Sequence, residues 1–245
     1  MQKKYGFLMH VDRSSRPDAE ALIEKHREQI RKFRVNEALE RLYMNRQPEH
    51  AVPYEAITEF YDYARVIIGD VPVTYLEFGV ATGRSISRIA ERFSHPEARF
   101  FGFDSFEGLP EPWVRRGKTM EAGRFSKGGR EPVGLDPRIT FVKGWFQNTL
   151  PTFLKANESG FGNSVLVHYD ADLYSSTLFV LSMLWPVIDT YHFIFDEFMA
   201  HEIIALYDFS QAFPVEIKFL SQTSANNGYP GRIFGQIARV PFAPA

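Results

Sequence analysis

Four acidic residues follow two apolar, β-rich segments of the chain and could act together. Asp170 and Asp172 close the segment NSVLVHYDAD, and Asp196 and Glu197 close the segment YHFIFDE. Alternate residues of an extended chain point to one side, so Asp170 and Asp172 are expected to face one crevice. Carboxylates gathered in this way repel one another unless they are protonated or bind a cation. Oxygen ligands without cysteine favour a hard divalent cation, Mg²⁺ before Mn²⁺ or Ca²⁺.

Such a cation could orient a hydroxylated substrate and lower the pKa of its hydroxyl, while a remaining carboxylate takes the proton. The alternative for any one of these acids is a capping role, which Asp172 could have before the helix that the next residues predict. We interpret the four acids together as a metal site.

A glycine turn precedes these acids in the chain. The segment 73–85, VTYLEFGVATGRS, predicts a strand, a tight turn with Gly79 and Gly83, and the start of a helix whose free N–H groups can face a nucleotide-like ligand. Asp104, about 20 residues beyond the turn, suits hydrogen bonds to ribose hydroxyls. The turn lacks the G-x-G-x-x-G pattern of dinucleotide sites, and Glu77 would repel a pyrophosphate. The cationic cofactor S-adenosylmethionine therefore fits better.

Aromatic and imidazole side chains give weaker signals. Trp145 and Phe146 follow a predicted strand and could either stack on an adenine ring or fill the core. His168 and His192 lie within predicted strands, which favours core or edge positions over ligand roles.

The elements that must position these residues alternate between strand and helix. This alternation predicts an α/β fold with a doubly wound, mostly parallel, seven-stranded Rossmann-like sheet. In such sheets ligands bind beyond the carboxyl ends of the strands, where the acids stand. The predicted strands cover 73–78, 98–104, 138–142, 163–170, 191–196, 215–219 and 232–240. Helices are predicted over 84–93, 175–184 and 201–213.

Two regions depart from this alternation. Residues 1–70 predict a helical extension, with helices over 17–44 and from Pro53 to Gly69, that packs on the sheet or serves as a lid or dimer arm. Residues 71–245 form the predicted catalytic domain. Within it, the Gly- and Pro-rich segment 105–137 is a long basic loop, either a solvated mobile face or a clamp for an acidic substrate.

Composition excludes several classes of protein. The chain has 245 residues, 44% hydrophobic and 24% charged, which is ordinary for one globular domain with additions. A net charge of −2 gives no reason to expect nucleic acid or anionic membrane as a partner. No cysteine is present, so disulfides and thiolate chemistry are excluded. No apolar run is long enough for a signal peptide or a membrane span, and we expect a cytoplasmic protein.

Five motifs in fixed order resemble the macrocin O-methyltransferase family. They are YLEFGVATGRS, FGFDSFEGLPEPW, FVKGWFQNTLP, VHYDADLYSSTL and FIFDEF, and they cover about residues 54–198. The family consists of class I, S-adenosylmethionine-dependent and magnesium-dependent enzymes that methylate hydroxyls of sugars on natural products. The resemblance implies the same activity here, on a small hydroxylated acceptor.

The resemblance also implies roles for single residues. Asp170, Asp196 and Glu197 would bind Mg²⁺, although members of the family often have a second aspartate where this chain has Glu197. Asp172 would be the general base. The residues that would hold the cofactor are Glu77, Gly79, Thr82, Ser85, Asp104, Ser105, Trp145, Phe146 and Asp170.

Two alternatives remain open at this point. One is an NAD- or nucleotide-dependent enzyme of the same fold. The other is a non-catalytic cofactor-binding or oligomeric scaffold protein that uses the N-terminal helices as its interaction surface. Whichever function holds, the charged helix predicted over 17–44 favours a homodimer.

Overall fold

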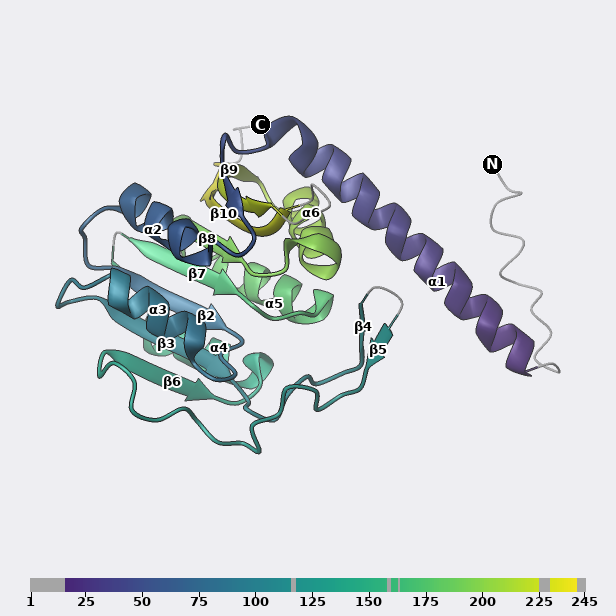
Figure 1. Ribbon diagram of the computed structural model, residues 1–245, viewed down its shortest axis with the longest axis horizontal. Coiled ribbons are helices and arrows are strands. Elements are labelled where there is room, and N and C mark those ends of the chain that lie inside the picture. Colours follow the sequence, from purple (N-terminus) through teal and green to yellow (C-terminus); the bar gives the residue numbers. More distant parts are fainter. Residues whose placement is uncertain (1–15, 116–117, 158–159, 163, 225–229, 242–245) are drawn as a thin grey trace.

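The protein is built on one eight-stranded sheet (Figure 1). The computed structural model describes residues 16–115, 118–157, 160–162, 164–224 and 230–241; residues 1–15 of the predicted N-terminal extension lie outside them. The spatial order of the strands is β1-β9-β10-β8-β7-β2-β3-β6. The strands are β1 (His50–Pro53), β2 (Thr74–Phe78), β3 (Arg99–Asp104), β6 (Ile139–Lys143), β7 (Val165–Tyr169), β8 (Thr190–Phe195), β9 (Val215–Ser224) and β10 (Pro230–Arg239).

The sheet is parallel except at β10, which is antiparallel to both of its neighbours. This confirms the predicted mostly parallel α/β sheet. The strand count differs from the prediction because β1 adds an eighth strand, which pairs in parallel with β9. Its four residues are too short to show a period, and Pro53 ends this strand instead of opening a helix.

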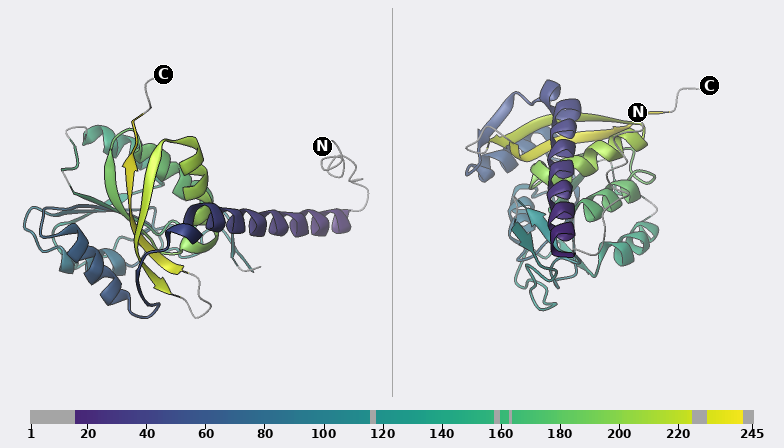
Figure 2. Two further views of the ribbon diagram at one scale, coloured as in Figure 1. Left: turned by 90° about the horizontal axis from the view of Figure 1, so that it is seen from above. Right: turned by 90° about the vertical axis from the view of Figure 1, so that its right-hand side faces the viewer.

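Helices cover both faces of the sheet, as a doubly wound fold requires (Figure 2). One buried cluster joins α2 and α3 to the sheet through Phe60 and Ile89. The other joins α4, α5 and α6 through Leu150, Leu181 and Leu206. The helices are α1 (Arg16–Ala38), α2 (Ile57–Ile68), α3 (Arg84–Arg92), α4 (Phe146–Ala156), α5 (Tyr174–Leu184) and α6 (Ile203–Ala212). None of the helices in the described part of the chain is long and apolar enough to cross a bilayer.

The two central strands, β2 and β7, are buried along their whole length. Covered faces explain their near-continuous apolar sequences, TYLEF and VLVHY. Each nevertheless carries one acidic or basic side chain without solvent exposure, Glu77 in β2 and His168 in β7. Burying such groups is costly unless they are paired, so they mark a built polar site inside the sheet.

Helix α1 projects from the body of the molecule (Figure 2) and is tied to it near its C-terminal end. Arg34 forms an ion pair with Asp208 of α6. The π-helical turn η3 (Leu39–Tyr43) and the 3₁₀ turn η4 (Met44–Arg46) then lead to β1. The helical prediction for 17–44 therefore matches α1 and η3.

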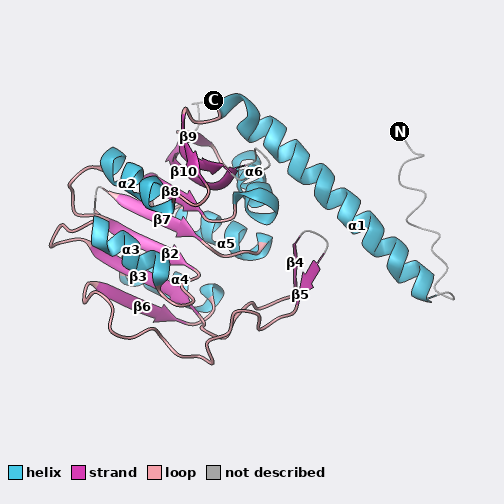
Figure 3. Ribbon diagram, viewed as in Figure 1, coloured by secondary structure: helices cyan, strands magenta, loops and turns pink. Residues whose placement is uncertain are grey.

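The long basic segment between β3 and β6 is mostly loop, as predicted (Figure 3). It also contains a two-stranded antiparallel ribbon, β4 (Trp113–Arg115) and β5 (Lys118–Met120). Arg31 of α1 donates a hydrogen bond to the backbone oxygen of Val114, at 3.1 Å. The N-terminal helix thus contacts the ribbon.

Candidate active site

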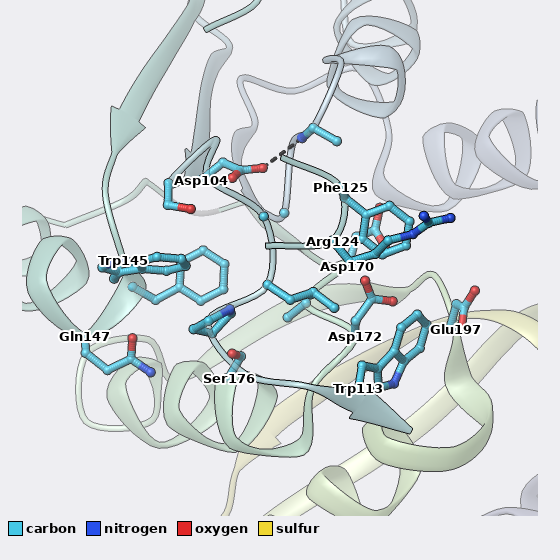
Figure 4. A pocket seen from close by; sticks show the side chains of 18 residues that line it. Asp104, Trp113, Arg124, Phe125, Trp145, Gln147, Asp170, Asp172, Ser176 and Glu197 are labelled. Carbon is cyan, nitrogen blue, oxygen red and sulfur yellow. Dashed lines mark hydrogen bonds between the residues drawn. The ribbon is translucent and has the colours of Figure 1, made fainter. Parts of the chain in front are cut away.

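A cavity of about 330 Å³ opens at the carboxyl ends of β2, β3 and β7 (Figure 4). This is the edge at which parallel α/β sheets bind ligands. Asp104 and Trp145 lie toward one end of the cavity, and Asp172, Glu197 and Trp113 toward the other. The lining residues are Gly79, Ala81, Asp104, Ser105, Gly108, Leu109, Pro110, Trp113, Arg124, Phe125, Trp145, Phe146, Gln147, Asp170, Ala171, Asp172, Ser176 and Glu197.

Gly79 lets the chain after β2 pass close to the chain after β7. Its φ is +99°, and a Cβ atom there would lie 2.0 Å from the backbone oxygen of Asp170. The glycine N–H donates to the carbonyl of Phe103 at 3.0 Å, and the Asp170 N–H donates to Phe78 at 2.9 Å. No residue with a side chain fits at this crossing, which explains why glycine begins the turn.

Asp104 both stands on the cavity wall and fixes the turn. Its Oδ2 accepts hydrogen bonds from the backbone N–H groups of Val80 and Ala81, at 2.9 and 2.8 Å. Its Oδ1 accepts one from the N–H of Phe106, at 2.6 Å. Ala81 has a positive φ of 49°, so these bonds stabilise a backbone conformation that is unfavourable for a residue with a side chain.

Glu77 lies behind this turn and is not one of the lining residues. Its carboxylate accepts hydrogen bonds from the hydroxyls of Ser85, at 2.7 Å, and Tyr75. Thr82 is exposed and also lies off the cavity wall. Of the residues predicted to hold a cofactor, Gly79, Asp104, Ser105, Trp145, Phe146 and Asp170 line the cavity, whereas Glu77, Thr82 and Ser85 do not.

His168 connects Glu77 to the end of β8. Its Nδ1 is 2.7 Å from the hydroxyl of Tyr75 and 3.5 Å from Oε2 of Glu77. Its Nε2 is 3.7 Å from Oδ1 of Asp196. Burial alone would lower the pKa of His168, but the two carboxylates raise it to about 10. The prediction of a core position for His168 is confirmed.

Asp196 forms an ion pair with Arg232. Arg232 of β10 donates from Nε to Oδ1 at 2.7 Å and from an Nη to Oδ2 at 3.4 Å. Burial would raise the pKa of Asp196, but His168 and Arg232 lower it to about 2. Asp196 is not one of the residues that line the cavity.

The other predicted acids do share the cavity. Asp170, Asp172 and Glu197 all line it, and Asp172 has a positive φ of 59°. Burial, followed by the nearby carboxylate of Asp196, raises the pKa of Asp170 well above its ordinary value. The cavity therefore brings together three of the four acids that the sequence analysis identified. The fourth, Asp196, forms an ion pair with Arg232.

A fifth acid, Glu202, was missed. It ends the π-helical turn η5 (Phe198–Glu202), is 1% exposed, and accepts a hydrogen bond from the Glu197 N–H at 3.2 Å. Burial and the charges of the four other acids raise the pKa of Glu202 well above its ordinary value. The sequence gives no signal for this role, because Glu202 falls in a segment with a helical pattern.

The predicted ligands of a metal ion are not assembled as one binding set. Among the described residues, no group of three His, Asp or Glu side chains is arranged to hold a metal ion. Asp170 and Glu197 line the cavity, but Asp196 is directed to the guanidinium of Arg232. Asp170, Asp196 and Glu197 therefore do not form the three-carboxylate Mg²⁺ site that the resemblance implies.

Apolar and cationic residues of the segment 105–137 complete the cavity and were not predicted individually. Trp113, which is 2% exposed, packs with Leu109 and Leu173. Phe125 has a positive φ of 71°, and the guanidinium of Arg124 lies 5.4 Å from the centre of its ring. The sequence did contain a signal for these positions: an isolated aromatic residue in a polar, glycine-rich segment indicates an apolar contact elsewhere in the fold.

Comparison with known proteins gives the family. Residues 55–218 match the model of the macrocin-O-methyltransferase (TylF) family. Two O-methyltransferases of known structure resemble the chain. NovP is 20% identical, over 77% of this chain and 79% of that one, with a TM-score of 0.49. TomG from Streptomyces achromogenes, involved in tomaymycin synthesis and solved with S-adenosylmethionine, is 14% identical over 85% and 90%, with a TM-score of 0.45.

No match is found among curated proteins. The family match covers two thirds of the chain and includes the glycine turn and the acids of the cavity. It decides between the predicted methyltransferase and the dinucleotide-dependent or scaffold alternatives. The chain belongs to the macrocin-O-methyltransferase (TylF) family and is an S-adenosylmethionine-dependent O-methyltransferase.

Proposed function

We propose that this enzyme methylates a hydroxyl of a sugar or another polyhydroxylated small molecule, with Asp172 as general base. The observation that carries the proposal is the single cavity that runs from Asp104 and Trp145 to Asp172 and Glu197 (Figure 4). One end has the groups that suit an adenosine, and the other has a carboxylate that can accept a proton.

The adenosine of the cofactor would occupy the first end. Asp104 and Ser105 offer acceptors and a hydroxyl to the ribose, and Trp145 and Phe146 offer ring faces to the adenine. The sulfonium would lie toward Asp170, because its positive charge favours the ionised carboxylate and so lowers the raised pKa of that group. That Glu77, Thr82 and Ser85 also hold the cofactor stays a prediction. None of the three lines the cavity, and Ser85 donates a hydrogen bond to Glu77.

The acceptor would occupy the second end, between Trp113 and Asp172. Its hydroxyl gives its proton to a carboxylate oxygen of Asp172. The oxygen then forms a bond to the methyl carbon while the bond from that carbon to sulfur breaks, so that a methyl ether and the neutral thioether S-adenosylhomocysteine result. Orientation of the two reactants in one cavity supplies the main contribution of the protein.

A divalent cation was predicted at Asp170, Asp196 and Glu197, and it would add polarisation of the acceptor hydroxyl. The fit described above does not support this set, since Arg232 engages Asp196. The proton transfer to Asp172 is therefore derived without a metal. Residues 71–245 would carry the reaction. Residues 1–70 would lie at the acceptor side or form a dimer contact, which stays a prediction. The cytoplasmic location also stays a prediction.

Calorimetric titration of S-adenosylhomocysteine, with Mg²⁺ and again with EDTA, tests the cofactor site. We expect micromolar binding in both conditions. Labelled S-adenosylmethionine with a panel of glycosylated natural products and simple polyols then tests the acceptor class. Transfer to phenols alone, with none to sugars, would contradict the proposed acceptor, and absence of cofactor binding would contradict the proposed site.

A further inference from the structure

The ion pair between Asp196 and Arg232 is built into the sheet. The two residues lie at neighbouring positions of the antiparallel strands β8 and β10, next to the registered pair Phe195 and Ile233. Their side chains are 18% and 12% exposed. A cross-strand pair of this kind is preorganised, because the backbone register alone brings the two charges together.

Further contacts hold the arginine in position. The Arg232 N–H donates to Oγ1 of Thr223 on β9, at 2.8 Å. Its guanidinium lies 4.7 Å from the centre of the Tyr54 ring. Contacts to β9 and to the segment after β1 thus restrain both the backbone and the head group of Arg232. The guanidinium is a planar donor that suits a carboxylate and cannot lose its charge.

A second side chain borders the same carboxylate. His168 approaches Asp196 from β7, with Nε2 3.7 Å from Oδ1. The far side of the imidazole is occupied by Tyr75 and Glu77, so the ring cannot turn away without breaking the 2.7 Å contact to the Tyr75 hydroxyl. Asp196 therefore lies between Arg232 and His168, which come from its two neighbouring strands.

We infer that Arg232, not a divalent ion, is the cationic partner of Asp196, so that this aspartate is an ion-pair anchor of the site and not a metal ligand. A divalent ion bound to Asp196 would meet the positive charge of Arg232 at short range. It would also compete for oxygen lone pairs with the guanidinium, which already donates to both carboxylate oxygens. The inference rests on the proposed cavity site but not on the identity of the acceptor.

The pair also explains how the cluster of acids is tolerated. Arg232 is not one of the residues that line the cavity, and it provides positive charge at the end of β8, where a metal was predicted. Its removal leaves a largely buried carboxylate without its strongest partner, which makes Asp196 available to an added cation.

Binding of Mn²⁺ tests this inference without any enzymatic assay. The probe is Mn²⁺ alone, titrated into the purified chain and followed by the electron paramagnetic resonance signal of the free ion. We expect the Asp196→Asn variant to bind Mn²⁺ as the wild type does. We expect Arg232→Met to bind Mn²⁺ at least tenfold more tightly than the wild type, and the double variant Arg232→Met/Asp196→Asn to lose that gain. Arg232→Lys, which keeps a positive charge, is the matched control and should not show it.

Two results would overturn the inference. One is Mn²⁺ binding by the wild type that Asp196→Asn weakens tenfold or more. The other is a folded Arg232→Met variant, as judged by circular dichroism, that binds Mn²⁺ no better than the wild type. If Arg232→Met does not fold, the Mn²⁺ affinities of the wild type and of Asp196→Asn still test whether Asp196 is a metal ligand. Failure of the cofactor site itself would appear separately, as loss of S-adenosylhomocysteine binding by the wild type.

Discussion

Asp172 combines a proton-accepting side chain with an unusual backbone. Its φ of 59° lies in the left-handed region, which aspartate and asparagine tolerate better than most residues. The Asp172→Asn variant therefore preserves the local conformation and removes the base. We expect turnover to fall by about 10²- to 10⁴-fold, while the Kd for S-adenosylhomocysteine changes little.

Steady-state kinetics and calorimetry on the same preparation check this expectation. Asp189→Asn is the control, since Asp189 is 84% exposed and lies next to the start of β8, at the end of the strand away from the cavity. If the turnover of Asp172→Asn lies within threefold of that of the wild type, Asp172 is not the general base.

Gly79 allows a direct test of the crossing between the two central strands. In Gly79→Ala the new methyl group would lie 2.0 Å from the Asp170 oxygen, so the strands must separate. We expect a loss of about 3 kcal/mol or more in the free energy of unfolding, with loss of cofactor binding. Gly134→Ala is the matched control, because Gly134 also has a positive φ but no atom within 4 Å of the added carbon. Urea unfolding should show a cost of about 1 kcal/mol there.

At the scale of elements, the turn η5 carries a buried acid. Because the pKa of Glu202 is raised in the folded protein, the unfolded chain releases this proton at lower pH, and stability falls as pH rises above the ordinary glutamate pKa. Glu202→Gln removes this penalty and keeps an acceptor for the Glu197 N–H. We expect its melting temperature to exceed that of the wild type at pH 7 and to approach it near pH 4. A lower melting temperature at pH 7 would mean that Glu202 is charged and needed.

The elements differ in how well the sequence predicts them. Strands β2 and β7 are mostly apolar and are followed by a glycine or acids, so both their type and their carboxyl ends could be predicted. Helix α4 was not predicted, because Pro151 inside it normally disfavours a helix and the pattern at Trp145 and Phe146 is aromatic. The ribbon β4–β5 has three residues a strand, which is too short to show alternation.

The candidate site was predictable only where the signal was local. Asp170 and Asp172 follow β7 directly, so the end of a single strand brings both to the cavity. The pairing of Asp196 with Arg232 depends on the order of β8 and β10 in the sheet, which no local pattern contains. The position of Glu202 depends on a π-helical turn, and that is not distinguished from an α-helix by periodicity over five residues.

At the scale of the whole molecule, buried tyrosines set the alkaline limit of stability. Burial raises the pKa of Tyr43 to about 12, against the smaller opposite effect of its hydrogen bond to Gln222. The pKa values of Tyr61, Tyr75, Tyr169, Tyr174 and Tyr191 are raised as well. The unfolded chain then loses protons above pH 10 that the folded chain keeps, so stability decreases as pH rises from 10.

Each such tyrosine contributes at most about 1.4 kcal/mol per pH unit to that decrease. We expect urea unfolding to show a steep loss of stability between pH 10 and 11. Tyr43→Phe should be less stable than the wild type at pH 8, where it lacks the bond to Gln222, and should regain part of that difference at pH 11. A difference that stays constant between the two pH values would contradict the buried, neutral state of Tyr43.

The hydrogen bond from Arg31 to Val114 joins a helix outside the cavity to the strand that begins with Trp113. We predict that product leaves past Trp113 with a movement of that strand, which the bond would resist. Helix α1 would then lengthen the residence time of the product without contacting the reacting atoms. Arg31→Ala should shorten the lifetime of bound S-adenosylhomocysteine in stopped-flow measurements, whereas Lys32→Ala, 72% exposed on the same helix, should leave it unchanged. Equal lifetimes of bound S-adenosylhomocysteine in the two variants would show that the bond from Arg31 to Val114 does not slow product release.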